Sequence, residues 1–239
     1  MSDERPGWVL VFDLDETLSA VNDSEWAGVA VTPFKKALLN PKTIEILKIA
    51  VASRRRKSCV AAILLLTNND SVEYIDGIVK RLEEKVGCRA GTLFDLKARR
   101  TDTVTPRTPD PVNGAGYPLK DVETVKRMMK NLGKPTEGLA SRILFFDDIP
   151  NHAMSHEMRP SQYIVMKWVT KEGGKIVSTD DKTNYSPVYE AIGYPVKKKQ
   201  TPYHRLTKLV RGTRDTRKNR AASRSRDVRR RMERGEKYN

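Results

Sequence analysis

The chain has few cysteines and no long apolar segment, and both absences limit the classes of protein to which it can belong. Cys59 and Cys88 are the only cysteines among 239 residues, too few for a disulfide framework, so a reducing compartment is expected. The longest apolar run is Val60–Leu66, far below the roughly 20 residues that a membrane-spanning helix needs. The amino-terminal sequence MSDERPGW is charged and has no secretory apolar segment. We therefore expect an intracellular protein of the nucleus or cytoplasm (or a virion, for a viral chain), neither secreted nor bound to a membrane.

Aromatic residues are also scarce, at 7%, whereas charged residues make up 31% of the chain. The charge is unevenly distributed. Residues 197–239 contain 17 Lys and Arg against 4 Asp and Glu, a net charge of +13, which leaves +2 of the formal +15 for residues 1–196. This basic tail has few apolar residues, so we expect it to be disordered or to fold on binding.

The charge of the basic tail (residues 197–239) favours an anionic partner, although a merely solubilising tail is the simplest alternative. Each Lys or Arg that contacts a phosphate releases a counterion, which gives affinity without sequence specificity. RNA or DNA is therefore the expected partner. The next alternative is an acidic protein or a nuclear-import receptor, which would recognise KKK at 197–199 and RDVRRR at 226–231. A membrane surface is disfavoured because the tail lacks an apolar anchoring face.

Over residues 8–168, short apolar runs alternate with segments of helical periodicity, and this pattern predicts an α/β fold. This alternation is typical of a Rossmann-like parallel sheet with helices on both faces. Strands are expected over 8–15, 59–67, 92–96, 142–148 and 162–168. Helices are expected over 41–56, 71–86 and 120–132, with Ser71 and Asp121 as N-caps and Gly87 and Gly133 as stops. Residues 169–196 are expected to pack on this core through Tyr185, Tyr189 and Ile192.

Polar residues follow three of the predicted strands at the point where each strand ends. Ligands of parallel sheets collect outside the carboxyl ends of the strands. Three strand ends would therefore bring carboxylates, a hydroxyl group and an ammonium group together at one reaction site. The segments concerned are DLDET at 13–17, Thr67-Asn68, Lys120 and Asp147-Asp148.

These residue types suit phosphoryl transfer through a covalent intermediate. Of two aspartates separated by one residue, one can attack phosphorus while the other protonates the leaving oxygen and then activates water. The attacking carboxylate and the phosphoryl dianion repel each other, so a cation is needed. Mg²⁺ is suitable because it prefers oxygen ligands and binds one or two carboxylates together with the substrate phosphate. Asp147 and Asp148 stand where such ligands are needed.

The order and spacing of four segments resemble those of haloacid-dehalogenase (HAD) superfamily phosphatases. The segments are FDLDETL (12–18), LLTNN (65–69), YPLKD (117–121) and FFDDIP (145–150). The resemblance covers residues 8–168 and looks closest to the branch without a large cap domain that contains polymerase-tail phosphatases. It is also similar to short phosphatases of large DNA viruses. One position departs from the tail-phosphatase branch, which usually has Asn where this chain has Asp148.

The resemblance implies a role for each residue of the site. Asp13 would be the nucleophile and Asp15 the general acid and base. Thr67 and the backbone amide of Asn68 would hold the phosphoryl group together with Lys120. Mg²⁺ would be bound by Asp13, the carbonyl group of Asp15 and Asp147, with Asp148 binding it directly or through water. The chain is thus expected to be a Mg²⁺-dependent phosphomonoester hydrolase.

Both inserts into the core (residues 1–168) are too short to form a lid domain. Residues 18–40 suffice for a hairpin flap with Trp26 and Phe34 as apolar contacts, and residues 98–118 predict a turn-rich loop. An uncovered site admits a phosphate on a macromolecule, either a phosphoprotein or a nucleic-acid terminus. The alternative is a nucleic-acid-binding protein anchored by its basic tail, with a slow or vestigial HAD domain.

Truncation after Pro195 should abolish binding to a labelled single-stranded oligonucleotide, because it removes nearly all of the net positive charge. The affinity of the full chain should fall roughly 10³-fold between 50 and 200 mM salt if six or more phosphates are contacted. Fluorescence anisotropy measures both effects. Equal binding by the truncated chain would contradict a nucleic-acid role for the tail.

Overall fold

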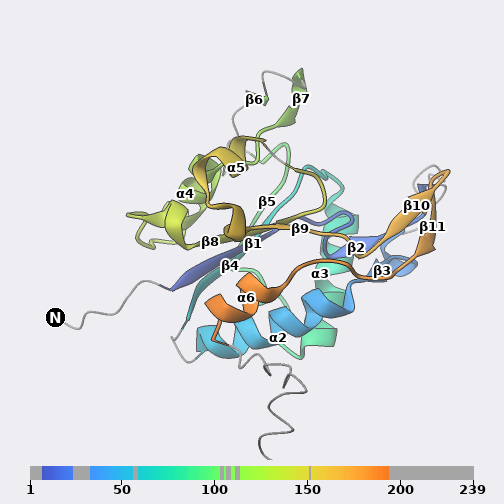
Figure 1. Ribbon diagram of the computed structural model, residues 1–239, viewed down its shortest axis with the longest axis horizontal. Coiled ribbons are helices and arrows are strands. Elements are labelled where there is room, and N and C mark those ends of the chain that lie inside the picture. The colour runs from blue at the N-terminus through green and yellow to red at the C-terminus, as the bar shows by residue number, and fades with distance from the viewer. Residues whose placement is uncertain are drawn as a thin grey trace, which may run out of the picture. The chain divides into compact units, whose positions relative to one another are not determined.

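Strand β1 (Trp8–Phe12) lies at the centre of a five-stranded parallel sheet in the computed structural model (Figure 1). The strand order is β5-β4-β1-β8-β9, and every pairing is parallel. The structure describes residues 7–23, 33–55, 59–102, 105, 109–110, 114–150 and 152–193. The other strands of the sheet are β4 (Val60–Leu66), β5 (Leu96–Ala98), β8 (Ile143–Asp147) and β9 (Tyr163–Val165). The predicted α/β class with a parallel sheet is confirmed.

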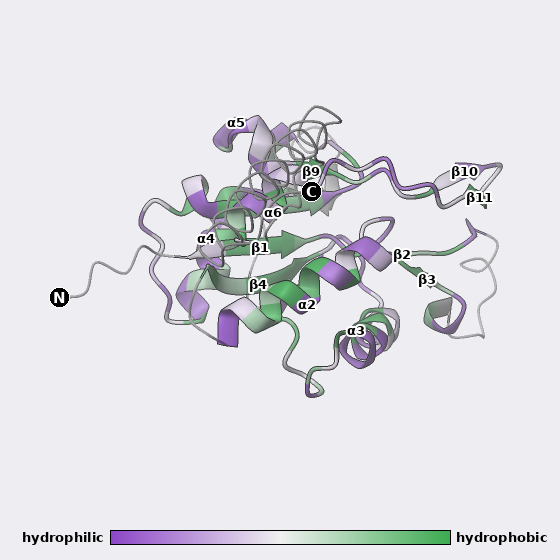
Figure 2. Cartoon of the chain, turned by 60° about the horizontal axis from the view of Figure 1, so that its bottom comes forward, coloured by the Kyte–Doolittle hydropathy of each residue, from purple (hydrophilic) through white to green (hydrophobic). Residues whose placement is uncertain are grey.

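Helices cover both faces of this sheet. Successive side chains of a strand point to opposite faces. Accordingly, Leu10 and Phe12 belong to one apolar cluster, with α2 (Pro41–Arg55) and α3 (Val72–Val86). Val9 and Val11 belong to a second cluster, with α4 (Val122–Asn131) and α5 (His152–Glu157). Strands β1 and β4 are apolar along their length (Figure 2), as strands covered on both faces must be.

The predicted helix caps are confirmed by their hydrogen bonds. The Ser71 side chain accepts from the backbone N–H of Tyr74 at the start of α3. The Asp121 side chain accepts from the N–H of Thr124 at 2.7 Å at the start of α4. Gly87 ends α3 with a φ of 78°, a conformation that glycine adopts without a steric penalty.

The strand predicted over 92–96 lies instead at Leu96–Ala98, so this boundary was wrong. Leu93 and Phe94 are buried as expected. However, the carboxylate of Glu83 accepts hydrogen bonds from the N–H groups of Thr92 and Leu93. A side chain of α3 thus takes the donors that a neighbouring strand would have used, and sheet pairing with β4 begins only at Leu96.

Within the described residues, three short strand pairs lie outside the central sheet. The described ends of the flap pair as the expected hairpin, with β2 (Ser19–Ala20) antiparallel to β3 (Leu38–Leu39). Its predicted contact Phe34 packs against the core, whereas Trp26 lies outside the described residues. The predicted loop at 98–118 contains a second pair, β6 (Pro109–Asp110) and β7 (Gly114–Pro118), so that segment is not wholly loop. Short 3₁₀ helices are found at Pro33–Lys35, Leu139–Arg142 and Pro160–Gln162.

Residues 169–193 form a third strand pair and a helix. These are β10 (Thr170–Glu172), β11 (Lys175–Ser178) and α6 (Ser186–Ala191). Tyr185 and Ile192 are buried in the cluster that contains α2 and α3, and Tyr189 packs against it. The predicted packing of these three residues on the core is confirmed.

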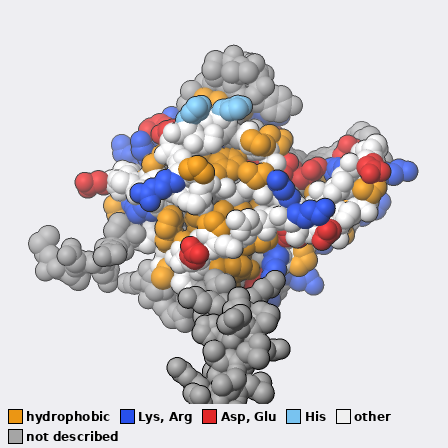
Figure 3. All heavy atoms as spheres, viewed as in Figure 1, with side chains coloured by type: hydrophobic (Ala, Val, Ile, Leu, Met, Phe, Trp, Pro, Cys, Tyr) orange, Lys and Arg blue, Asp and Glu red, His pale blue; other side chains and the backbone are white. Residues whose placement is uncertain are grey.

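Positive and negative side chains are interspersed on the face shown in Figure 3. This mixture is in keeping with the near-neutral charge of residues 1–196. The basic tail lies outside the described residues. None of the helices in the described part of the chain has the length and apolarity needed to cross a bilayer.

Gly77→Ala should destabilise the protein, although alanine has the higher helix propensity. A Cβ at Gly77 in α3 would overlap the ring of Phe34, and such overpacking costs about 1–3 kcal/mol against a propensity gain of about 1 kcal/mol. In a Phe34→Ala background the same substitution should instead stabilise, because the ring is gone. Urea unfolding of the wild type and the three variants measures this change of sign, and an equal effect in both backgrounds would contradict the packing described.

Candidate active site

The register of the central strands brings Asp13 and Asp147 side by side. Phe12 pairs with Phe146 across β1 and β8, and their rings stack with centroids 4.2 Å apart. The N–H of Asp13 continues the ladder by donating to the carbonyl oxygen of Phe146 at 2.9 Å. The two aspartates therefore leave neighbouring strands at the same level, at the carboxyl edge of the sheet.

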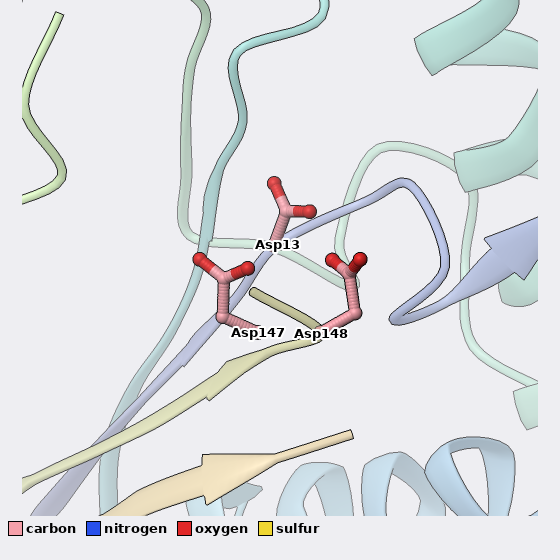
Figure 4. Close-up of side chains that lie close together, drawn as sticks. All are labelled: Asp13, Asp147 and Asp148. Carbon is pink, nitrogen blue, oxygen red and sulfur yellow. The ribbon is translucent and has the colours of Figure 1, made fainter. Parts of the chain in front are cut away.

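Three carboxylates converge at this edge. Asp13, Asp147 and Asp148 each offer an oxygen atom, and these atoms all lie within 4.8 Å of one another. Their carboxylates point to the same side of the sheet in Figure 4. An all-oxygen donor set of this charge fits a hard divalent cation such as Mg²⁺, which takes carboxylate ligands and retains water.

A buried ammonium group contacts two of these carboxylates. The Lys120 Nζ forms an ion pair with Asp13 Oδ1 at 2.8 Å and donates a hydrogen bond to Asp147 Oδ2, also at 2.8 Å. Burial by itself would lower the pKa of Lys120, but the charges of Asp13 and Asp147 raise it well above its ordinary value. Lys120 therefore stays positively charged in the closely packed floor of the site.

One ammonium group does not balance the negative charge around it. Burial and the charge of Asp13 raise the pKa of Asp147 and of Asp148 above the ordinary value. The same two causes raise the pKa of Asp15 to about 7. Protons or a divalent cation would relieve the repulsion among these groups.

Asp15 lies at the rim of the site and is held by a residue that the sequence prediction missed. Its Oδ2 accepts a hydrogen bond from Asn69 Nδ2 at 3.0 Å, and Asn69 Oδ1 accepts from the N–H of Ser71 at 2.9 Å. Asn69 thus connects Asp15 to the start of α3. In the sequence, Asn69 had only the appearance of a turn residue after Thr67 and Asn68.

Thr67 and Asn68 follow β4 at the same edge of the sheet. The N–H of Thr67 donates to the carbonyl of Ala98 at 3.0 Å, and its buried hydroxyl oxygen accepts from the N–H of Asn69 at 3.0 Å. Asn68 is partly exposed, and its Oδ1 has no hydrogen-bond partner among the described residues. The structure thus places all seven predicted site residues at the carboxyl ends of β1, β4 and β8 or at the start of α4.

Comparison of the chain with protein-family models, with curated proteins and with solved structures found no match. The functional argument therefore depends on the motifs and on the geometry of this site.

In EDTA, the free energy of unfolding should be about 1 kcal/mol lower at pH 8 than at pH 6, after allowance for partial exposure of the rim. The pKa of Asp15 is raised from 3.8 to about 7, so the folded protein binds more protons than the unfolded chain between these values. The stability that this proton provides is lost as the pH rises through about 7. Mg²⁺ should reduce the difference, because a cation held by Asp13, Asp147 and Asp148 would offset the charge of Asp13 that raises the pKa of Asp15. Urea unfolding at both pH values measures this.

The variant Asp148→Asn is the matched control for this dependence of stability on pH and on Mg²⁺. Removal of one carboxylate should raise the stability at pH 8 in EDTA and flatten the pH dependence, while the stabilisation by Mg²⁺ becomes smaller. An unchanged Mg²⁺ effect in this variant would exclude Asp148 from the cation site.

Proposed function

We propose that this chain is a Mg²⁺-dependent phosphomonoester hydrolase of the haloacid-dehalogenase type, acting through an aspartyl-phosphate on Asp13. The observation that carries the proposal is the convergence of oxygen atoms from Asp13, Asp147 and Asp148 within 4.8 Å, beside the buried ammonium of Lys120. A merely structural cluster has no need for more carboxylates than its ammonium group can balance.

In the first step, the carboxylate of Asp13 attacks phosphorus, and the bond between phosphorus and the leaving oxygen breaks. Asp15 donates its proton to that oxygen, so the leaving group departs as a neutral alcohol. In the second step, Asp15 takes a proton from a water molecule, which attacks phosphorus and releases phosphate and the free Asp13 carboxylate. A pKa of about 7 for Asp15 suits both proton transfers near neutral pH.

The remaining residues hold the phosphoryl group and the metal. Lys120 and the hydroxyl of Thr67 would contact phosphoryl oxygens, together with the backbone amide of Asn68. Mg²⁺ would be held by the carboxylates of Asp13, Asp147 and Asp148 and the carbonyl of Asp15. When bound there, it would offset the repulsion between the Asp13 carboxylate and the phosphoryl dianion.

The arrangement of buried and exposed groups supports a macromolecular substrate. Asp13 is 4% exposed and Asp147 is 1% exposed, whereas Asp15 and Asp148 at the rim are partly open to solvent. The inserts at 18–40 and 98–118 contribute short strand pairs in their described parts. A phosphate displayed on a protein side chain or on a nucleic-acid end could reach such a site.

A second candidate function is nucleic-acid binding by the basic tail, with a slow or vestigial phosphatase domain. The observation that favours it is the excess of 17 basic over 4 acidic residues in 197–239. The two functions are compatible if the tail holds a nucleic acid from which the site removes a terminal phosphate.

Asp13→Asn and Asp15→Asn should each lower kcat for an aryl phosphate by at least about 10²–10³-fold, because each removes a group that makes or breaks a bond. Asp76→Asn is the matched control, since Asp76 only pairs with Lys97 at the surface, and it should retain wild-type turnover. Steady-state kinetics with Mg²⁺ and with EDTA, and circular dichroism to confirm folding, make the comparison. Near-wild-type rates in either site variant would rule out this mechanism.

A further inference from the structure

Two residues just beyond β9 contact the loop that carries Asp15. The indole Nε1–H of Trp168 donates a hydrogen bond to the carbonyl oxygen of Glu16 at 2.5 Å. The ammonium of Lys171, in β10, lies 2.6 Å from Glu16 Oε1. Trp168 is only 2% exposed, so this contact is made inside the protein. Glu16 is thus held by its backbone and by its side chain.

Glu16 is in a conformation that needs such support. Its φ is 54°, and it is the only residue other than glycine with a positive φ among the described residues. Side chains of L-residues rarely adopt this left-handed region. The N–H of Glu16 donates to the carbonyl of Ser19 at 2.7 Å, which closes a tight turn directly after Asp15. The direction of the Asp15 side chain depends on this turn.

The segment that contains Trp168 and Lys171 also contacts the flap, near its first strand. Lys171 Nζ donates a hydrogen bond to Asp23 Oδ1 at 2.9 Å. The N–H of Asp23 donates to the carbonyl of Gly174 at 2.8 Å, and the N–H of Ile176 donates to Asn22 Oδ1 at 2.8 Å. In Figure 1 the pair of strands β10 and β11 lies at the same end of the molecule as β2 and β3. The loop at 13–23 is therefore held at Glu16 and again at its far end.

We infer that Trp168 and Lys171 are positioning residues that keep Glu16 in its left-handed conformation and so direct the Asp15 carboxyl toward the leaving group. This inference rests on the proposed function, since it assigns the pair a part in the proton-transfer step. Neither side chain contacts Asp13 or Lys120 in the described interactions. Their loss should therefore affect the proton transfers and leave phosphate binding nearly unchanged.

Trp168→Phe retains an aromatic ring but removes the N–H donor. It should lower kcat for a poorly activated alkyl phosphate about 10-fold or more, with KM changed less than twofold. The loss should be smaller for an aryl phosphate with a good leaving group, which needs little protonation. The matched control is Trp8→Phe at the amino end of β1, far along the strand from Asp13, which should behave as wild type with both substrates.

Glu16→Asn, added to Trp168→Phe, should recover at least half of the lost kcat. Asparagine enters the left-handed region several-fold more often than most residues, so the turn then needs less support. Amide hydrogen exchange gives a readout independent of turnover. The amides of Glu16, Leu18 and Ser19 should exchange faster in Trp168→Phe than in wild type or in Trp8→Phe.

Lys171→Met tests the same inference if Trp168→Phe fails to fold, because Lys171 lies nearer the surface. Lys175→Met, on the exposed part of β11, is its control. The positioning role is overturned, and the proposed function stands, if Asp13→Asn and Asp15→Asn abolish turnover while Trp168→Phe or Lys171→Met retains wild-type kcat and amide protection. Wild-type turnover in Asp15→Asn overturns both.

Discussion

The ion pairs of the buried Lys120 ammonium are the interaction on which the rest of the site depends. Asp13 and Asp147 are almost fully buried, where water no longer solvates their charge, so their carboxylates repel each other strongly. The ammonium lies 2.8 Å from an oxygen of each and offsets part of this repulsion. Lys120 reaches this position because Asp121, the next residue, caps α4 and fixes where that helix begins.

Exposure divides the acidic residues into two groups. Asp13 and Asp147 form the buried floor, where the ammonium balances part of their charge. Asp15 and Asp148 stand at the partly exposed rim. Burial and the charge of Asp13 raise the pKa of both rim residues, as they raise that of Asp147. A pKa of about 7 suits Asp15 to its proposed role as proton donor, and a cation would offset the charge that raises the pKa of Asp148. In the proposed mechanism, the same sheet edge would thus provide a nucleophile, an acid and a metal ligand from one residue type.

The segment after β9 contacts the site as well as the core of the protein. It begins at the edge strand of the sheet, contacts Glu16 through Trp168 and returns to the core through Tyr185 and Ile192. The turn after Asp13 therefore depends on residues more than 150 positions later in the chain. Such a link makes the geometry around Asp15 sensitive to a region that carries none of the proposed reacting groups.

The sequence by itself determined the parallel sheet, most of the helix boundaries and the location of the seven predicted site residues at the carboxyl edge of that sheet. Apolar runs that end in polar residues are a local pattern, and parallel pairing brings such ends to one edge. Tertiary structure alone decided the contacts of Asn69 with Asp15 and of Trp168 with Glu16. It also moved the start of β5 to Leu96, because Glu83 bonds the preceding backbone. Each of these contacts joins residues that are not neighbours in the chain, and the local sequence around one residue does not indicate which residue it will contact. The reason is that a hydrogen bond across the fold depends on how helices and loops pack.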